Sequence, residues 1–326
     1  LKHGRQLYME HCMHCHGVSG DGSGPTARYL NPLPRDYRKG VFKFTSTKKD
    51  LKPNRDDLKR TIKLGIPGTY MPSFMLLTDK ELQSVTEYVR WLALRGELEL
   101  KLLSLLPDYS NSKQARKLRE KARSAQGEAS QTRSEQEDEL EATLKQFLTS
   151  QGEFDDSGFR EGVDEEANFL VESWDRVAHG DNVIRPSAPR TPSSPVSIQR
   201  GRRLYLDKKL NCRNCHGDTG LGNGPQTRDY EKDATKPGLF DDWGHPLKPR
   251  NLTTGIYRGG RRPIDIYRRI RSGIKGAKMP AFDVNVASEQ DVWDLVNYVL
   301  SIPLRDTANI SQTDEHDHTR ADASGD

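Results

Sequence analysis

Two stretches of the chain place apolar residues three and four positions apart, which is the pattern of a helix with one buried face. They are "ELQSVTEYVRWL" at 81–92 and "QDVWDLVNYVLSI" at 290–302. A capping-box pair stands at the start of each stretch: Thr78 with Glu81, and Ser288 with Asp291. The hydrophobic pattern therefore predicts a mostly helical, all-α protein.

The two helical stretches belong to an internal duplication. "GRQLYMEHCMHCHGVSGDGSGP" at 4–25 matches "GRRLYLDKKLNCRNCHGDTGLGNGP" at 201–225. Further on, "RTIKLGIPGTYMPSF" at 60–74 matches "RRIRSGIKGAKMPAF" at 268–282, and each predicts a short helix that ends at a glycine. Because such a repeat indicates two copies of one folding unit, we expect two similar small domains.

The duplication divides the chain into four parts. The first domain is expected at 1–106 and the second at 196–305, each a helical unit with long loops. A charged, partly helical segment at 107–195 joins them, and an acidic, disordered tail is expected at 306–326. A unit of roughly 100 residues has a thin apolar core, so each domain is expected to contain something besides side chains in its interior.

The composition argues against a membrane-spanning protein. Hydrophobic residues make up 33% of the chain and the mean hydropathy is −0.84, which is low for a compact protein of this size. No apolar run reaches the roughly 20 residues that a membrane span needs. The start, "LKHGRQLYMEHC", has no apolar leader sequence. We expect a processed or truncated form from which an upstream leader or anchor is missing.

The formal net charge of +4 conceals alternating basic and acidic blocks. From the first part of the chain to the last, the charges are +7, −6, +8 and −5. The basic blocks lack a nucleic-acid-binding motif and interleaved aromatic residues, which argues against nucleic acid as a partner. A basic face that docks an acidic protein is the favoured interpretation, and a solvated surface is the alternative.

All four cysteines stand in two Cys-x-x-Cys-His motifs, "CMHCH" at 12–16 and "CRNCH" at 212–216. With no other cysteine in the chain, a disulfide framework is disfavoured. A thiol–disulfide redox centre would need a βαβ context, and a four-cysteine zinc site would explain neither the histidines nor the separate repeats. Attachment of a c-type haem explains every residue, because two thiols add to its vinyl groups and the histidine ligates the iron. We therefore predict two haem c groups per chain.

The sixth iron ligand is expected from a methionine in each repeat. Met71 aligns with Met279 in the shared pattern Gly-x-x-Gly-x-x-Met-Pro. Core filling is the alternative role for a methionine, but Met279 is the only methionine after Met75. Met75 is a rival in the first repeat, although it aligns with Asp283 in the second. His245, in a loop without a counterpart in the first repeat, is a weaker rival for the second site.

Each repeat resembles a small class I cytochrome c domain, and the whole chain resembles a dihaem cytochrome c. The likeness covers 1–95 and 196–303 and rests on the motifs quoted above. It implies a helical fold, thioether bonds from the cysteines, and a histidine–methionine pair on each iron. The implied ligands are Cys12, Cys15, His16 and Met71 in the first domain, and Cys212, Cys215, His216 and Met279 in the second.

The resemblance also implies partners for the ligands. In the family, the Gly-Pro region accepts the hydrogen bond of the proximal imidazole, a role that would suit Pro25 and Pro225. Arg35 and Arg250 occupy the same repeat position after a proline. Each could pair with a haem propionate, and a solvated surface arginine is the alternative.

The joining segment is the least regular part of the sequence. "SKQARKLREKARSAQGEASQTRSEQEDELEATLKQFL" at 112–148 is compatible with an exposed helix, a helix lying on a partner, or a disordered region. "EEANFLVESWDRV" at 165–177 carries a short apolar stripe and is expected to be a docking helix. A Pro/Ser-rich linker is expected at 185–197.

Together these features predict electron transfer, with no catalytic residue. We expect a subunit of a membrane-associated respiratory oxidoreductase complex, which meets redox proteins or other subunits through the basic domain surfaces and residues 107–195. A dihaem peroxidase-like enzyme is the alternative, but it needs a haem whose sixth position opens, and the paired methionines argue against that. A haem-based sensor or an interaction module is a third hypothesis. The family attaches haem outside the cytoplasm, so the resemblance implies the periplasm or the outer face of the cytoplasmic membrane.

Overall fold

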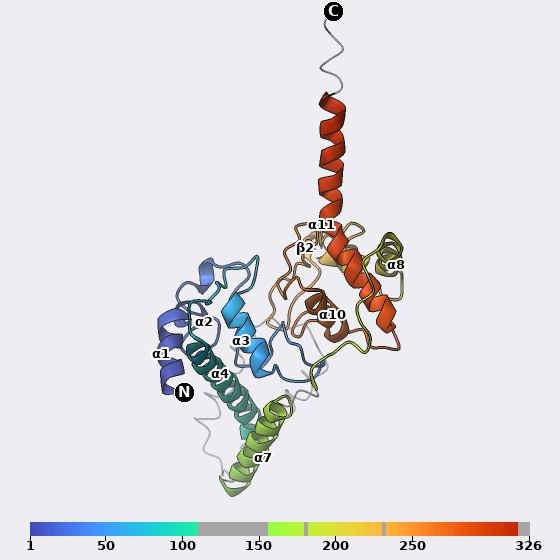
Figure 1. Cartoon of the computed structure of the whole chain (residues 1–326). Helices are drawn as coiled ribbons and strands as arrows, with labels where there is room; N and C mark the ends of the chain where they lie inside the picture. The colour runs from blue at the N-terminus through green and yellow to red at the C-terminus, as the bar shows by residue number, and fades with distance from the viewer. Residues whose placement is uncertain (110–155, 179–181, 230–232, 319–326) are drawn as a thin grey trace, which may run out of the picture. The chain divides into compact units, whose positions relative to one another are not determined.

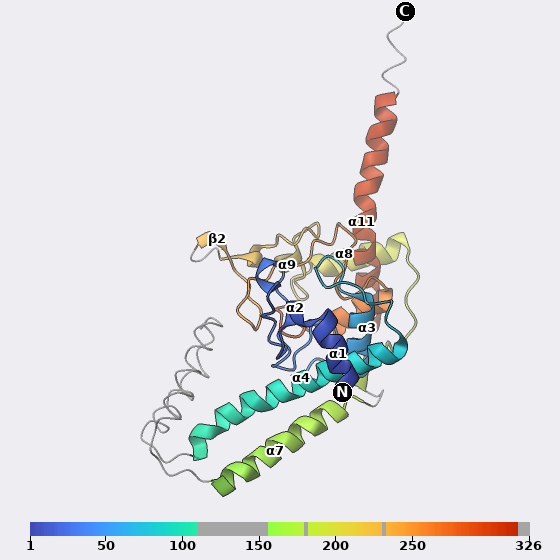
Figure 2. The same ribbon diagram turned by 90° about the vertical axis from the view of Figure 1, so that its left-hand side faces the viewer.

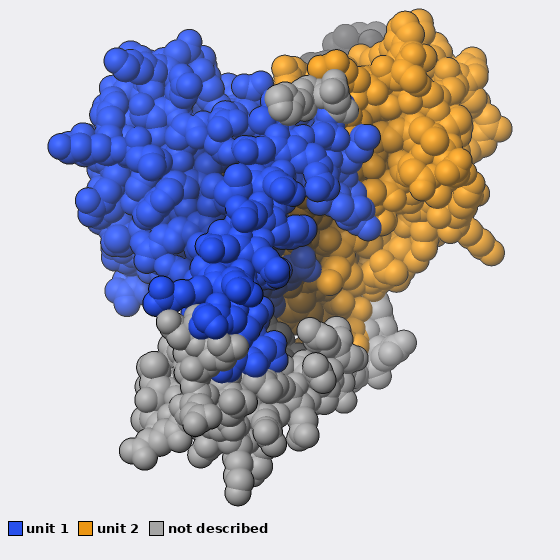
Figure 3. Space-filling view, turned by 90° about the horizontal axis from the view of Figure 1, so that it is seen from below, with its two compact units in different colours: residues 1–65, 69–183, 242–245 blue, residues 66–68, 184–241, 246–326 orange. Residues whose placement is uncertain are grey.

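The computed structural model describes residues 1–109, 156–178, 182–229 and 233–318. The described chain is mostly helical and divides into two compact units (Figures 1 and 3). The first unit comprises Leu1–Gly65, Thr69–Val183 and Asp242–His245, and the second comprises Ile66–Gly68, Ile184–Asp241 and Pro246–Asp326. The predicted fold class, two small helical domains with long loops, is confirmed.

The two units repeat the same order of elements. The first contains α1 (Lys2–His11), α2 (Met13–His16), η1 (Ala27–Tyr29), α3 (Arg55–Leu64), α4 (Asp79–Leu105), η2 (Leu106–Tyr109) and α7 (Asp156–Asp175). The second contains α8 (Pro195–Leu206), α9 (Arg213–His216), η4 (Pro225–Thr227), β1 (Arg228–Asp229), β2 (Asp233–Pro237), α10 (Pro263–Ser272) and α11 (Glu289–His318). Strands β1 and β2 form a small antiparallel pair, an addition without a counterpart among the described elements of the first unit.

The long helices begin where the capping residues predict. The backbone N–H of Thr78 donates to Glu81 Oε2 at 2.8 Å, and that of Glu81 donates to Thr78 Oγ1 at 3.3 Å. Ser288 and Asp291 exchange the same two hydrogen bonds at 2.9 and 3.2 Å. Each pair satisfies backbone donors that a helix start would otherwise leave unpaired. Both predicted capping boxes are therefore confirmed.

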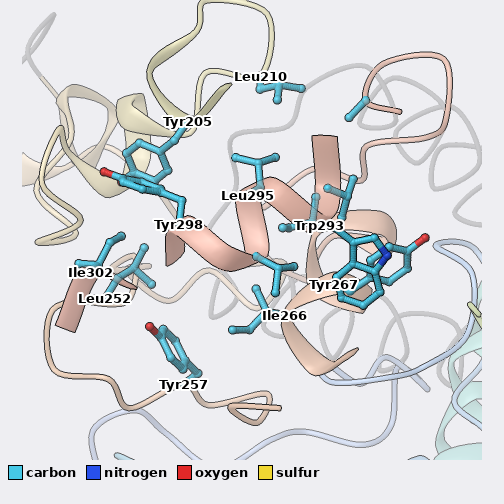
Figure 4. Packing of buried hydrophobic residues seen from close by; sticks show 14 residues of the cluster. Tyr205, Leu210, Leu252, Tyr257, Ile266, Tyr267, Trp293, Leu295, Tyr298 and Ile302 are labelled. Carbon is cyan, nitrogen blue, oxygen red and sulfur yellow. The ribbon is translucent and has the colours of Figure 1, made fainter. Parts of the chain in front are cut away.

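Each core forms where the first helix of the repeat crosses its last helix, which is α1 with α4 in the first unit and α8 with α11 in the second. A tyrosine pair marks both crossings. Tyr8 of α1 contacts Tyr88 of α4 with ring centroids 5.3 Å apart and planes at 59°. Tyr205 of α8 contacts Tyr298 of α11 at 5.2 Å and 57°. Figure 4 shows the second cluster, in which Tyr205 and Tyr298 lie beside Leu295, with Trp293 and Tyr267 at the other end. The duplication is thus preserved in side-chain packing.

A glycine allows each pair of helices to approach closely. A Cβ atom on Gly4 would overlap the carbonyl oxygen of Ser84, and one on Gly201 would overlap the carbonyl oxygen of Asp294. The obstructing atoms are backbone, so a larger residue cannot be accommodated by a rotamer change. Glycine at these positions is therefore required by the helix crossing rather than by a turn.

Substituting alanine for Gly4 or Gly201 should destabilise the unit that contains it. Because the added methyl group forces two packed helices apart, we expect a loss of about 1–3 kcal/mol in the free energy of unfolding. Urea unfolding followed by circular dichroism measures this loss. Gln6→Ala, on the exposed side of α1, is the control and should leave stability nearly unchanged. Equal effects of Gly4→Ala and Gln6→Ala would contradict the interpretation.

The described part of the joining segment belongs to the first unit as far as Val183, and its last residues, from Ile184, belong to the second. Helix α7 lies antiparallel to α4 (Figure 2), and Lys101 of α4 forms an ion pair with Glu166 of α7 at 3.0 Å. Leu170 and Trp174 of α7 are buried, whereas Phe169 is 57% exposed. The expected docking helix therefore packs against its own chain, because its apolar stripe completes the first core. The stretch expected at 112–148 lies outside the described residues.

The C-terminal helix is longer than the sequence pattern predicts. The chain beyond Arg305 was expected to be disordered, but α11 continues through Pro303 to His318. Residues 319–326 lie outside the described part. Neither α11 nor any other described helix is long and apolar enough to cross a membrane.

Candidate haem sites

In the first unit, one helical turn brings the two thiols and the imidazole of the motif together. The carbonyl oxygen of Cys12 accepts hydrogen bonds from the backbone N–H of Cys15 at 3.2 Å and of His16 at 2.9 Å. Cys12 ends α1 and begins α2, so the motif lies where the chain leaves the first core helix. The two-residue spacer sets the two cysteines three positions apart, which is nearly one turn of a helix.

The second unit builds its motif in the same way. The carbonyl oxygen of Cys212 accepts from the backbone N–H of Cys215 at 3.3 Å and of His216 at 2.9 Å. In each site the glycine after the histidine is held by a buried tyrosine: the hydroxyl groups of Tyr8 and Tyr205 donate to the carbonyl oxygens of Gly17 and Gly217, both at 2.7 Å. The two sites are therefore the same structure built twice.

Both imidazoles are held by a backbone carbonyl group. His16 Nδ1 lies 3.2 Å from the carbonyl oxygen of Arg35, and His216 Nδ1 lies 3.3 Å from that of Arg250. A carbonyl oxygen only accepts, so Nδ1 carries the proton and the lone pair lies on Nε2. Burial lowers the pKa of His16 to about 4 and also lowers the pKa of His216. Both rings are thus neutral near pH 7, the form that ligates a metal.

The hydrogen-bond acceptor differs from the one expected at the Gly-Pro loop. Pro25 follows Gly24, which packs against the backbone of Met13 and His14. The next residue, Thr26, donates its hydroxyl proton to the carbonyl oxygen of His14 at 2.7 Å. The loop is therefore tied to the backbone of α2 and not to the imidazole.

The second unit shows the same departure at Pro225. Gly224 packs against the backbone of Arg213 and Asn214, and its N–H donates to the carbonyl oxygen of Cys215 at 3.1 Å. The roles expected of Pro25 and Pro225 thus belong to the backbone of Arg35 and Arg250. The sequence does mark these two arginines as equivalent, because "PRD" at 34–36 aligns with "PRN" at 249–251 in the repeat.

The side chains of the two arginines have other partners in this structure. The guanidinium group of Arg35 lies 3.6 Å from the ring centre of Trp243, which is part of the first unit. Arg250 Nε donates to the carbonyl oxygen of Ile256 at 2.7 Å. Pairing of either side chain with a haem propionate remains a prediction.

The two methionine loops fold back on the short helices that precede them. Helix α3 ends before Gly65 and α10 ends before Gly273, with φ angles of 66° and 65° that favour glycine. A Cβ atom on Gly65 would lie 2.7 Å from the carbonyl oxygen of Met71, and one on Gly273 would lie 2.5 Å from that of Met279. The glycines thus let the methionine backbone pass close to the helix end.

The loops also share their return contact and the burial of the methionine. The N–H of Phe74 donates to the carbonyl oxygen of Ile62 at 3.3 Å, and that of Phe282 donates to Ile270 at 3.0 Å. The residues at 71 and 279 are half-buried, whereas the rival Met75 is 62% exposed. Because Met75 is exposed to solvent, Met71 is favoured over Met75 as the iron ligand of the first site.

The alternative chemistries of the cysteines receive no support. All four thiols are free, and the two pairs lie in different units. Among the described residues, no three His, Cys, Asp or Glu side chains converge in a way that could hold a metal ion. His245, the rival axial ligand, belongs to the first unit.

The donor sets fit a covalently attached haem. Burial raises the pKa of Cys12 and of Cys212 to about 12, so both thiols are protonated near pH 7 when no group is bound to them. Each site adds one neutral imidazole with a free Nε2. Two thiols and one such imidazole on a single helical turn match the attachment and proximal ligation of one haem c.

One residue at the first site was missed by the sequence analysis. The ring of Tyr37 is stacked on the imidazole of His16, with centroids 4.8 Å apart and planes at 23°. In the second repeat the aligned residue is Leu252, and the backbone N–H groups of both donate to matching glycines at 2.7 Å. The sequence signal that could have found Tyr37 is a difference between the two copies, which have an aromatic residue at 37 and an aliphatic one at 252.

Comparisons with known proteins agree with the site chemistry. Residues 1–93 match the family Cytochrome c, and residues 196–299 match the family Cytochrome C oxidase, cbb3-type, subunit III. No curated protein matches the chain as a relative. A chain of the reducing HAO-like protein complex of Kuenenia stuttgartiensis shares the fold, with a TM-score of 0.60 and 23% identity over 93% of this chain and 96% of that chain. With one cytochrome c domain and one attachment motif in each repeat, the chain belongs to the dihaem cytochromes c and has two haem c groups.

Proposed function

We propose that this protein carries single electrons through its two haems, each held between a histidine and a methionine. The axial pairs are His16 with Met71, and His216 with Met279. One observation supports the proposal: both units contain the same pair of candidate ligands. One is a neutral imidazole that is hydrogen-bonded to a carbonyl group, and the other is a half-buried methionine on a loop that folds against a helix. A haem ligated on both faces has no position for a substrate, which favours a carrier over an enzyme.

The residues around each site supply rigidity. A haem c supplies a one-electron couple when bound. The carbonyl groups of Arg35 and Arg250 hold the imidazoles in one orientation. The hydroxyl groups of Tyr8 and Tyr205 restrain the turn that follows each histidine. Groups that keep their positions when the charge changes cost little reorganisation, so electrons enter and leave rapidly.

We further propose that the protein is a subunit of a membrane-associated respiratory oxidoreductase complex on the outer side of the cytoplasmic membrane. The second domain matches the family Cytochrome C oxidase, cbb3-type, subunit III. The two domains carry net charges of +7 and +8, which would steer an acidic redox partner or subunit toward them. Co-purification with a quinol-oxidising or terminal-oxidase module would support this assignment.

Spectroscopy of the purified holoprotein tests the carrier function. We expect a pyridine haemochrome count of two haems per chain, two one-electron steps in a potentiometric titration, and the near-infrared band of methionine–iron ligation in the oxidised form. Carbon monoxide should leave the reduced spectrum unchanged, because neither sixth position is open. Binding of carbon monoxide together with peroxidase turnover would overturn the proposal in favour of a dihaem peroxidase.

A further inference from the structure

A row of aromatic rings leads from the candidate proximal ligand of the first site to helix α7. Tyr37 is stacked on His16, and Phe42 is stacked on Tyr37 with centroids 5.8 Å apart and planes at 16°. Trp174 meets Phe42 edge-on at 6.4 Å and 82°. All four residues belong to the first unit. The row therefore joins the haem site to a helix that lies outside the repeat.

The far end of the row is anchored. Trp174 is only 1% exposed, and its Nε1 donates to Glu97 Oε1 at 2.9 Å. The other carboxylate oxygen of Glu97 forms an ion pair with Lys52. A buried carboxylate needs such partners, so Glu97 and the indole fix each other. The guanidinium group of Arg90, 5.5 Å from the ring of Trp174, adds a cation–π contact.

The second site has no equivalent of this row. Leu252 stands where the first repeat has Tyr37. Among the described residues of the second unit, no aromatic ring is stacked on His216. Helix α7 likewise has no counterpart in the second repeat, because it comes from the segment between the two copies. Two sites in which the carbonyl oxygen of the first cysteine accepts the same two backbone hydrogen bonds thus differ in what touches the proximal ring.

We propose that Tyr37, Phe42 and Trp174 are positioning residues that set the redox potential of the first haem separately from that of the second. The inference rests on the proposed electron-transfer function. A ligating imidazole becomes more positive when its iron is oxidised. The electron-rich face of a stacked aromatic ring stabilises a positive ring, so the row favours the oxidised form and lowers the potential. The segment between the repeats, which contributes Trp174, thereby helps to give the two haems different redox potentials.

The expected effect is moderate but measurable. An aromatic stacking contact contributes about 0.5–1.5 kcal/mol in total, so the part that differs between the oxidised and the reduced haem changes the redox equilibrium constant by at most about tenfold. A tenfold change in a one-electron couple shifts its potential by 59 mV. Tyr37→Leu gives the first site the residue of the second, so it should raise the potential of the first haem by up to this amount. Trp174→Leu should shift it in the same direction by less, because Trp174 acts through Phe42.

Potentiometric titration of the holoprotein with each variant is the test. The first haem is assigned with Met71→Ala, which should alter its spectrum alone. We expect Tyr37→Leu to move the first step and leave the second in place, while Tyr37→Phe, which keeps the ring, should restore the wild-type value. Trp91→Phe, at an exposed tryptophan of α4 outside the row, serves as the control and should move neither step.

The outcomes separate this inference from the proposed function. If both haems are present with their methionine bands and Tyr37→Leu moves neither step, the inference is wrong while the carrier function stands. Equal shifts of both haems would also overturn it, because a general loss of stability does not select one site. If the wild-type protein contains no haem, the proposed function itself fails. Should Tyr37→Leu not fold, Trp174→Leu and Trp174→Phe provide the same comparison.

Discussion

Replacing Cys12 and Cys15 together by alanine is expected to leave one covalently bound haem per chain instead of two. Thioether bonds are the covalent link between a haem c and its protein, and the first unit has no other cysteine to form them. Loss of the haem should also destabilise the first unit, since its apolar core is small. A pyridine haemochrome count and the mass of the intact protein measure the change.

The duplication provides the matched control for this experiment. Alanine at Cys212 and Cys215 should again leave one haem, and alanine at all four positions should leave none. An unchanged haem count in either double variant would refute covalent attachment at that motif. Zinc in place of haem in the wild-type protein would reinstate the four-cysteine alternative.

Replacing Met71 by alanine is expected to remove the sixth ligand of the first haem alone. About half of the intensity of the near-infrared methionine–iron band should be lost, because one of two histidine–methionine sites remains. The potential of the affected haem should fall, since a thioether ligand favours the reduced state. Carbon monoxide should then bind to one reduced haem per chain, which visible spectroscopy detects.

Met75→Ala is the matched control, because Met75 lies four residues away and is exposed. It should retain the whole band and should not bind carbon monoxide. Met279→Ala should reproduce the effect of Met71→Ala at the second haem. Loss of the band in Met75→Ala rather than in Met71→Ala would transfer the ligand assignment to Met75. An unchanged spectrum for Met279→Ala would reopen the case for His245.

The starts of the two long helices and the ends of the two short ones were predictable because their signals are local. Capping at Thr78 and Ser288 depends on a side chain three residues ahead, and the ends of α3 and α10 depend on a glycine just beyond. The attachment motif is also local, since one turn of helix brings its thiols and imidazole together. Comparing the two copies extended this information to the methionine loops.

The partners of the ligands were not predictable in the same way. The carbonyl groups of Arg35 and Arg250 come from chain positions 19 and 34 residues after the histidines they contact. The shared Pro-Arg motif shows that Arg35 and Arg250 are equivalent, but the identity of a residue does not show which group its backbone carbonyl accepts from. The docking helix was recognised at 165–177, but not its target, because an apolar stripe does not specify what covers it.

The sequence by itself determined the duplication, the helical class, the two attachment motifs and the methionine that each repeat offers. These follow from spacing within one element or from equivalence between copies. Only the tertiary structure decided that α7 completes the first core, that Arg35 and Arg250 hold the imidazoles, and that Tyr37 and Trp174 distinguish the first site. Such contacts join residues far apart in the chain, and burial between packed helices, not local conformation, selects them.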